Sequence, residues 1–342
     1  MRIIVTGAAG YVGSVLAPML AAEGHEVLAV DIDSIRLEQA RARTDGVRPS
    51  VHWARAGLDE LAMDRHLLAQ TEAIVHLAGV SSDAAAEHDP VATRRINLDL
   101  TLHLAHAAKA AGVRRFFLAS TVAIYQVPVG HRLEHELFRE GDAPPLGEPL
   151  GAYARTKLAA EQALFELADA DFATSVLRKG SLYGYAPIMR WDLMINRVVL
   201  AAWKGEPLLL HDFGAVWRPI AHVQDAARAY AHLLRLPPWT STGLAFNLVE
   251  RNVRISEILL EVDNTLASEH GRRIVLDYGR SPLGQRTGRA SGELLRRTGW
   301  RPLLTVAQGV ADLFWRLEHA EVAPVEEFEE RSPATVPVPE TS

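Results

Sequence analysis

A tyrosine and a lysine stand four residues apart in the segment YARTK, which begins at Tyr153 and ends at Lys157. The segment opens a run with helical periodicity, and residues four apart share one face of a helix. A nearby ammonium favours the ionised phenol, so we expect Lys157 to lower the pKa of Tyr153 from its usual value of about 10. A tyrosine in this setting can transfer protons as a general acid and base.

Two hydroxyl side chains, Ser120 and Thr121, follow the apolar run that begins at Phe116. A hydroxyl at the carboxyl end of a parallel strand faces the crevice in which such sheets bind ligands. Either residue alone would more often simply end a strand. Together with Tyr153 and Lys157, they complete a set of hydroxyl, phenol and ammonium groups suited to proton transfer.

A glycine-rich turn, TGAAGYVG, lies between the first predicted strand and the first predicted helix. Gly7 permits a tight turn, Gly10 lets the backbone approach a pyrophosphate, and Gly13 allows the helix to pack closely on the strand. The free amides and positive dipole end of the helix N-terminus attract phosphate. The order of strand, turn, helix and second strand therefore predicts dinucleotide binding.

An acidic residue, Asp31, ends the second predicted strand 18 residues beyond Gly13. A carboxylate in this place accepts hydrogen bonds from the adenosine ribose and repels a 2′-phosphate, which favours NAD over NADP. Arg36 could offset that repulsion, and a solvated acid at a strand end is the plainer alternative. We expect NAD as the cofactor.

These groups need a framework that brings strand ends and helix starts together. Short β-rich runs alternate with longer helical patterns in the first half of the chain, which predicts an α/β fold: a Rossmann-type, doubly wound parallel sheet. The predicted strands are Arg2 to Thr6, Glu26 to Val30, Val51 to Ala54, Ala73 to Leu77, Arg114 to Ser120 and Thr174 to Arg178. The predicted helices cover about residues 11–23, 34–43, 60–69, 89–111 and 152–169.

The regular alternation ends near residue 180, so we expect residues 1–178 to form the NAD-binding domain. Residues 179–320 are then mainly a smaller substrate-binding lobe, with a helix over 226–236 and a strand over 244–248 returning to the sheet. Residues 321–342 carry Pro, Glu, Ser and Thr with few large apolar groups, and we expect a mobile tail.

Composition narrows the functional classes. The chain has 342 residues, a formal net charge of −6 and no cysteine. The dispersed negative charge disfavours a nucleic-acid partner, and the apolar runs are too short to span a membrane. The absence of cysteine excludes disulfides and thiolate metal sites and suits a cytoplasmic protein. Helically spaced histidine pairs such as His103 and His106 lack a third ligand nearby, so we expect no metal site.

Further motifs extend the pattern over about residues 1–318. They are HLAG at 76–79, Asn97, STVAIY at 120–125, RKGSLYG at 178–184 and WRPIAHVQD at 217–225. With the glycine turn and the YARTK segment, the sequence resembles the extended short-chain dehydrogenase/reductase superfamily. Within it, the sequence is similar to the NAD-dependent nucleotide-sugar epimerases and dehydratases, of the UDP-glucose/galactose 4-epimerase type.

The resemblance implies roles for individual residues. Thr121 would hydrogen-bond the reacting sugar hydroxyl, Tyr153 would move its proton, and Lys157 would hold the nicotinamide ribose. Arg218 would bind the diphosphate of a nucleotide sugar, and for a second arginine Arg280 fits the spacing better than Arg286. The positions implied to contact NAD are Gly7, Gly10, Tyr11, Val12, Asp31, Leu58, Leu77, Ala78, Gly79, Asn97, Ser120, Tyr153 and Lys157. The positions implied to contact the sugar nucleotide are Val80, Thr121, Ser181, Arg218 and Arg280.

Departures from the family pattern favour an epimerase over a dehydratase or a decarboxylase. Val122 and Ala123 stand where the family's dehydratases and decarboxylases carry an acid, and Ser181 replaces an expected asparagine. We therefore expect a C4 epimerase that acts through a transient 4-keto sugar. A keto-sugar reductase or a dehydratase is the alternative, and a non-catalytic dinucleotide sensor is disfavoured by the intact set of Thr121, Tyr153 and Lys157.

The resemblance also implies a homodimer. Relatives pair the helices that correspond to about 89–111 and 152–169 into a four-helix bundle. Both segments are rich in alanine and leucine here, beyond what one sheet-facing stripe requires.

Overall fold

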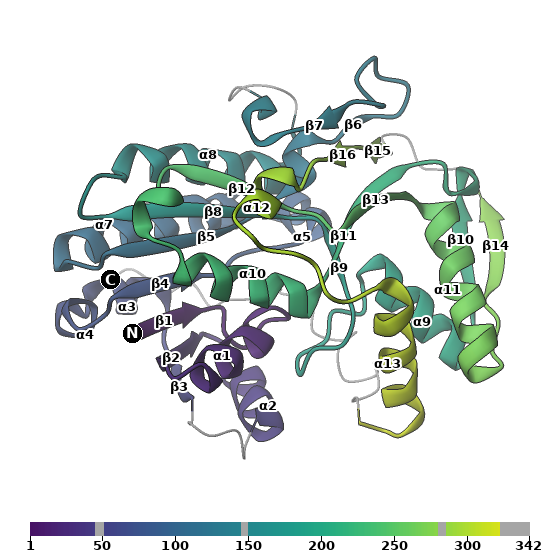
Figure 1. Cartoon of the computed structure of the whole chain (residues 1–342), viewed down its shortest axis with the longest axis horizontal. Helices are drawn as coiled ribbons and strands as arrows, with labels where there is room; N and C mark the ends of the chain where they lie inside the picture. The colour runs from purple at the N-terminus through teal and green to yellow at the C-terminus, as the bar shows by residue number, and fades with distance from the viewer. Residues whose placement is uncertain (45–50, 145–149, 280–284, 322–342) are drawn as a thin grey trace.

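A seven-stranded parallel sheet forms the centre of the protein, as the sequence predicts. The computed structural model describes residues 1–44, 51–144, 150–279 and 285–321. The strand order is β12-β8-β5-β4-β1-β2-β3 (Figure 1), so the chain reverses direction across the sheet between β1 and β4. Ligands of such sheets bind at this reversal, outside the carboxyl ends of the strands. The strands are β1 (Arg2–Thr6), β2 (Glu26–Asp31), β3 (His52–Arg55), β4 (Ala73–His76), β5 (Arg115–Thr121), β8 (Ala173–Lys179) and β12 (Leu244–Leu248).

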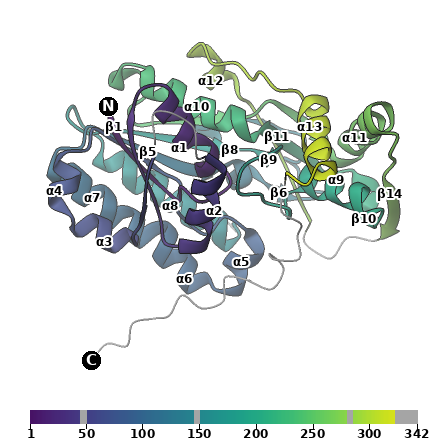
Figure 2. The same cartoon turned by 90° about the horizontal axis from the view of Figure 1, so that it is seen from below.

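Helices cover both faces of the sheet (Figures 1 and 2). On one face, α1 (Gly13–Ala22) and α10 (Val223–Arg235) pack on each other and on Ile3 and Val5 of β1. On the other face, Ile4 joins a separate cluster with α3 (Leu58–Met63), α4 (Arg65–Ala69), α7 (Thr101–Ala111) and α8 (Ala152–Leu167). Successive residues of a strand point to opposite faces, so the apolar β1 supplies both layers. α2 (Ser34–Thr44) packs beside β3.

Two predicted helices are divided in the structure. The helix expected over 60–69 breaks at Asp64, whose carboxylate accepts a hydrogen bond from the Leu67 amide at 2.9 Å and so begins α4. The helix expected over 89–111 begins with α6 (Pro90–Arg94), continues as a π-helical turn over Arg95–Leu100 and ends as α7. A short helix, α5 (Asp83–His88), precedes them.

The second half adds small sheets and three long helices beside the central sheet. The predicted helix over 226–236 is α10, and the predicted strand over 244–248 is β12, which joins the central sheet beside β8. α13 (Val306–Glu318) packs on α9 (Met194–Lys204) and α11 (Ile255–His270). The short strands are β9 (Ser181–Tyr183), β11 (Trp217–His222), β13 (Arg251–Arg254), β10 (Pro207–His211) with β14 (Val275–Gly279), β6 (Val127–Pro128) with β15 (Arg286–Thr287), and β7 (Leu137–Phe138) with β16 (Arg289–Ala290). The predicted mobile tail lies outside the described residues except for Glu321.

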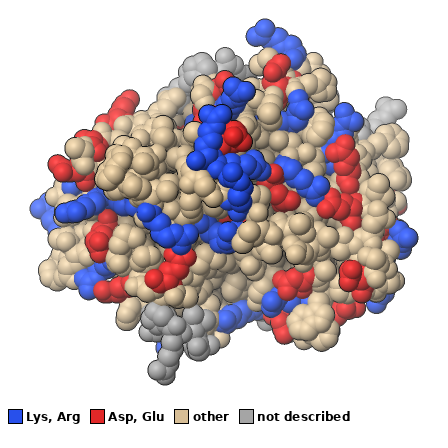
Figure 3. Space-filling view, in the orientation of Figure 1, with Lys and Arg blue, Asp and Glu red and all other residues tan. Residues whose placement is uncertain are grey.

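The surface carries mixed charge on the face shown in Figure 3. Basic side chains gather over the middle of that face, with acidic side chains among and around them. Ion pairs offset part of the basic charge, as between Arg228 and Asp225 at 2.5 Å and between Arg251 and Glu261 at 2.5 Å. None of the helices in the described ranges combines the length and the apolar character that crossing a bilayer requires.

Candidate active site

The glycine turn forms a tight cradle at the start of α1. A side chain at Gly7, which has φ of +67°, would place its Cβ 2.5 Å from the Ala78 amide nitrogen, and one at Gly13 would strike the Gly7 carbonyl. The Gly10 amide donates to the Gly7 carbonyl at 3.0 Å. Val12 precedes α1 without any side-chain cap, and the positive end of the helix dipole faces the turn, although the Ser14 and Val15 amides already donate to the Gly10 and Val12 carbonyls at 2.9 and 3.2 Å. The residues of the turn thus fit a pyrophosphate.

Tyr11 fixes the turn to the second half of the chain. Its buried hydroxyl donates to the Gly184 carbonyl at 2.5 Å and accepts from Asn196 Nδ2 at 3.0 Å. Burial raises the pKa of Tyr11, so the phenol stays protonated. The side chain that the family resemblance placed at the cofactor therefore has a structural partner of its own.

Asp31 ends β2 beside the cradle, where the sequence predicts it. Its carboxylate accepts hydrogen bonds from the Ala9 amide at 3.0 Å and the Asp33 amide at 3.2 Å. Burial raises the pKa of Asp31, and these backbone donors oppose the rise. The carboxylate is thus oriented by the turn that would hold the pyrophosphate. Leu58, at the start of α3, packs on the apolar cluster that includes Val30 of β2.

The loop after β4, from Leu77 through Ala78 and Gly79 to Val80, is held by Asn97. The Val80 amide donates to Asn97 Oδ1 at 2.9 Å, and Asn97 Nδ2 donates to the Val80 carbonyl at 3.0 Å. A Cβ on Gly79 would lie 2.6 Å from Asn97 Oδ1 and 3.1 Å from Lys157 Nζ. Only a glycine at position 79 lets this loop approach the ammonium so closely, and Asn97 reaches it from the π-helical turn.

Thr121 and Tyr153 meet at the end of β5. The Thr121 hydroxyl lowers the pKa of Tyr153, but burial outweighs this effect and raises that pKa to about 12. Burial lowers the pKa of Lys157 to about 8, partly opposed by the charge of Glu161. The expectation that Lys157 lowers the pKa of Tyr153 below about 10 is therefore wrong for the ligand-free protein, because helical spacing indicates proximity but not burial.

Ser120 points away from that pair, to a buried ion pair. Its hydroxyl donates to Glu161, and Arg178 donates to the same carboxylate, with Nη2 at 2.6 Å and Nε at 2.9 Å. Arg178 Nη1 also donates to the Tyr125 hydroxyl at 2.5 Å. The hydroxyl of Ser120 is thus hydrogen-bonded to Glu161 and directed away from Thr121 and Tyr153. Sequence reasoning missed Glu161, although it lies four residues after Lys157 on the same face of α8.

Two arginines gather near Asp83. Arg218 Nη1 donates to the Arg286 carbonyl at 2.7 Å, and Arg286 itself donates to the Gln126 carbonyl. Burial lowers the pKa of Arg218, which the charge of Asp83 opposes, and both guanidinium groups in turn oppose the raised pKa of Asp83. Arg280, the arginine that the spacing favoured, lies outside the described residues. The structure instead brings Arg286, which the spacing disfavoured as the second arginine, to Arg218.

Sequence reasoning also missed two cations near Thr121 and Tyr153. Arg190 lowers the pKa of Tyr153 by its charge, donates to Ser81 Oγ at 2.7 Å and pairs with Asp192 at 2.6 Å. Lys179 ends β8 directly beside Thr121 in the sheet register. Neither follows a recognisable spacing, so only the folded chain reveals them. Ser181 lies two residues further along, in β9 beside Ile220 of β11.

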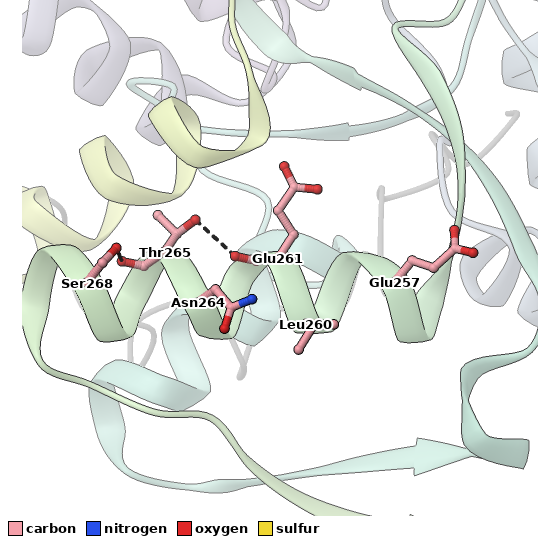
Figure 4. A pocket seen from close by; sticks show the side chains of 6 residues that line it. All are labelled: Glu257, Leu260, Glu261, Asn264, Thr265 and Ser268. Carbon is pink, nitrogen blue, oxygen red and sulfur yellow. Dashed lines mark hydrogen bonds between the residues drawn. The ribbon is translucent and has the colours of Figure 1, made fainter.

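A shallow pocket elsewhere lacks the chemistry for an anionic ligand. It lies on α11, and Figure 4 shows its side chains along one side of the helix. Its charged groups are carboxylates that already have partners: Glu257 accepts from the Arg254 amide at 3.0 Å, and Glu261 pairs with Arg251. The lining residues are Glu257, Leu260, Glu261, Asn264, Thr265 and Ser268.

Comparisons with known proteins agree with this geometry. The model of the NAD dependent epimerase/dehydratase family matches residues 3–248, a range that includes Asp31, Thr121, Tyr153 and Lys157. The chain is 26% identical over 338 residues to a protein named probable UDP-glucuronate 4-epimerase from Rhizobium meliloti (strain 1021), covering 91% of this chain and 95% of the relative. It is 26% identical over 315 residues to UDP-glucuronic acid decarboxylase 1 from Danio rerio, covering 90% and 71%.

A solved structure has the same overall fold. The structure of MoeE5 in complex with UDP-glucuronic acid and NAD gives a TM-score of 0.76 at 26% identity, covering 94% of this chain and 100% of the other.

Proposed function

This chain belongs to the NAD dependent epimerase/dehydratase family, and we propose that it is a C4 epimerase of a UDP-linked sugar. The observation that carries the proposal is the meeting of the Thr121 and Tyr153 side chains, shown by the influence of the Thr121 hydroxyl on the pKa of Tyr153, with Lys157 one helical turn along α8. The names of the relatives support the UDP-sugar class, since they act on or bind UDP-glucuronate.

The residues around the carboxyl ends of β1, β2 and β4 fit NAD, the cofactor of the family. In the proposal the cradle of Gly7 and Gly10 takes the pyrophosphate, Asp31 the adenosine ribose and Lys157 the nicotinamide ribose. Asn97 fixes the loop at Gly79 against Lys157. When bound, NAD supplies a reversible acceptor for the hydride on C4 of the sugar.

In the proposal, the neighbouring hydroxyls of Thr121 and Tyr153 define the position of the reacting sugar hydroxyl. A hydroxyl on C4 that reaches both Thr121 and Tyr153 is oriented by the first and gives its proton to the second. Loss of the proton from oxygen and of the hydride from carbon leaves a 4-keto sugar. The sugar then turns, and Tyr153 returns the same proton to the oxygen as the hydride returns to the other side of C4.

Proton transfer requires that Tyr153 be ionised when it accepts. Burial raises its pKa to about 12, so the phenolate is a minor species at neutral pH. The charge of Arg190 opposes the rise in the pKa of Tyr153. The ammonium of Lys157 belongs to the same face of α8 as Tyr153. We propose that these cations stabilise the phenolate in the closed site, where less water screens their charge.

The diphosphate belongs at the opposite end of the site in this proposal. Arg218 and Arg286 offer planar guanidinium groups that suit phosphate oxygens. Arg218 is fixed by the Trp217 and Arg286 carbonyls at 2.8 and 2.7 Å. We therefore prefer Arg286 to Arg280 as the second arginine, and we propose that residues 179–320 supply most of the substrate-binding lobe.

Elimination and decarboxylation lack a proton-transfer group after β5. Val122 and Ala123 follow Thr121 and are buried and half-buried apolar residues. Neither can remove a proton from C5. The proposal is tested by incubating the NAD-loaded protein with a panel of UDP-sugars and identifying the products by NMR. Inversion at C4 is the expected result, whereas a product that has lost water or carbon dioxide would contradict it.

We also propose that the protein is a homodimer. The helices expected at the interface correspond to α6, α7 and α8, and Val91 of α6 leaves 80% of its surface exposed. Burial of such a side chain against a second copy would be favourable.

A further inference from the structure

Lys179 stands at the same sheet edge as the catalytic hydroxyls. It ends β8, and its Cα pairs with that of Thr121 in the parallel register. The preceding pair, Ser120 and Arg178, converges on Glu161. Since successive residues of a strand alternate between faces, Lys179 and Thr121 share the other face. The half-buried ammonium of Lys179 therefore belongs to the environment of the reacting sugar.

The charges that act on Lys179 are themselves positive. Burial, together with the charges of Lys157 and Arg190, lowers the pKa of Lys179 to about 7. Lys157 has Glu161 nearby, and Arg190 has two hydrogen bonds to Asp192 at 2.6 Å each. Across the described part of the chain, no carboxylate forms an ion pair with Lys179. A partly buried cation in this position lacks its counter-charge.

The place of this cation indicates which group of a ligand would meet it. The diphosphate has its own arginines on β11 and β15, Arg218 and Arg286. Lys179 instead adjoins Thr121, where the C4 hydroxyl is proposed to bind. The substituents next to C4 on a hexose are the C3 hydroxyl and the group on C5, which is hydroxymethyl in a neutral hexose and carboxylate in a uronic acid. Only the carboxylate supplies the missing counter-charge.

We propose that Lys179 binds the carboxylate of a UDP-linked uronic acid and makes this chain selective for that class over neutral UDP-hexoses. The inference rests on the proposed function, because it uses the position of the C4 hydroxyl. It assigns to Lys179 a positioning role in substrate recognition, distinct from the proton transfer by Tyr153. The ion pair would offset the repulsion that the charges of Lys157 and Arg190 exert on Lys179.

The test measures binding without turnover. Dissociation constants of UDP-glucuronate, UDP-glucose and UDP are measured by calorimetry with the full-length, NAD-loaded Tyr153→Phe protein. We expect UDP-glucuronate to bind at least about tenfold more tightly than UDP-glucose, as for a desolvated charge pair. Adding Lys179→Met should abolish that preference and leave UDP and UDP-glucose within about twofold, whereas Lys179→Arg should keep most of it.

A matched control and three outcomes make the test decisive. Lys204→Met removes another lysine of the lobe, which lies 3.9 Å from Glu206, and should leave all three constants unchanged. Equal binding of the two sugars, or equal loss of both in Lys179→Met, would overturn the role of Lys179 and leave the proposed function standing. Failure of UDP and both sugars to bind would overturn the proposed function itself. If Lys179→Met does not fold, the preference of the parent protein and its retention in Lys179→Arg still decide.

Discussion

The buried pair between Arg178 and Glu161 should be the most sensitive support of the site. Glu161 is fully buried on α8, the side chain of Arg178 is 4% exposed on β8, and the closest atoms are 2.6 Å apart. Arg178→Met would leave a buried carboxylate with the Ser120 hydroxyl as its remaining side-chain donor. Breaking such a pair by removing one partner costs about 3–5 kcal/mol.

This loss converts into a measurable change in melting temperature. An unfolding entropy of about 2.1 cal/mol/K per residue gives about 0.7 kcal/mol/K for 342 residues. Arg178→Met should therefore lower the melting temperature by about 4–7 °C in a circular dichroism melt. The double variant Arg178→Met/Glu161→Leu removes both charges and should recover at least half of the loss.

An exposed ion pair provides the matched control. Arg297 and Glu293 lie 3.4 Å apart with 74% and 59% of their side chains exposed. Arg297→Met should change stability by less than about 1 kcal/mol, or about 1.5 °C. The reasoning is refuted if Arg178→Met melts no lower than this control, or if the double variant melts below Arg178→Met.

Four further predictions concern the site and the assembly. NAD should bind more tightly than NADP in calorimetric titrations because the carboxylate of Asp31 repels a 2′-phosphate, and equal or tighter NADP binding would contradict this role. Tyr153→Phe should lower kcat by at least about 10² while NAD binding persists, and Thr121→Ala should cost less; an active Tyr153→Phe variant would move the chemistry elsewhere. For UDP-glucose, which has no carboxylate for Lys179 to bind, kcat/KM should rise with pH through the neutral range, because the pKa of Tyr153 is raised to about 12 and its ionised fraction grows with pH. The rise should stop near pH 8, where Lys157 loses its proton, and a fall from pH 6 to 7.5 would count against this assignment. Light scattering at micromolar concentration should report a dimer through α7 and α8, and a monomer would end that proposal.

The regular half of the fold could be predicted because its signals are local. β1 spans Arg2–Thr6, as its apolar run indicates, and the other predicted strands of the first half differ from expectation by one residue at one or both ends. The breaks inside helices could not be predicted in this way. Asp64 interrupts one helix because its side chain caps the next, and a π-helical turn over Arg95–Leu100 keeps the same apolar periodicity as an α-helix. The two-residue strands β6 and β15 exist only because they pair with each other.

In the candidate site, too, the features that depend on local spacing could be predicted and those that depend on packing could not. Sequence spacing was enough to predict that Thr121, Tyr153 and Lys157 share one site, since strand ends and helix faces define those positions. In the structure Thr121 meets Tyr153, and Lys157 lies beside the loop at Gly79. It could not tell that burial raises the pKa of Tyr153, because burial depends on the packed surroundings. Lys179 was also missed, since its place beside Thr121 follows from the pairing of β5 with β8.

The same limit applies to the two arginines. Spacing favoured Arg280, but the pairing of β15 with β6 brings Arg286 to Arg218. Contacts of this kind link segments more than 60 residues apart and leave no local pattern in the sequence.

The most direct test of the central claim follows the hydrogen on C4 during turnover in deuterated water. A UDP-sugar is incubated with the NAD-loaded protein, and the product is analysed by NMR and mass spectrometry while absorbance is recorded at about 340 nm, where reduced nicotinamide absorbs. An epimerase that removes and returns one hydride within a closed site predicts inversion at C4, a product isobaric with the substrate, no deuterium on C4 and no accumulation of reduced cofactor. Deuterium on C4, net formation or consumption of reduced cofactor, or a product lighter by water or carbon dioxide would contradict the account.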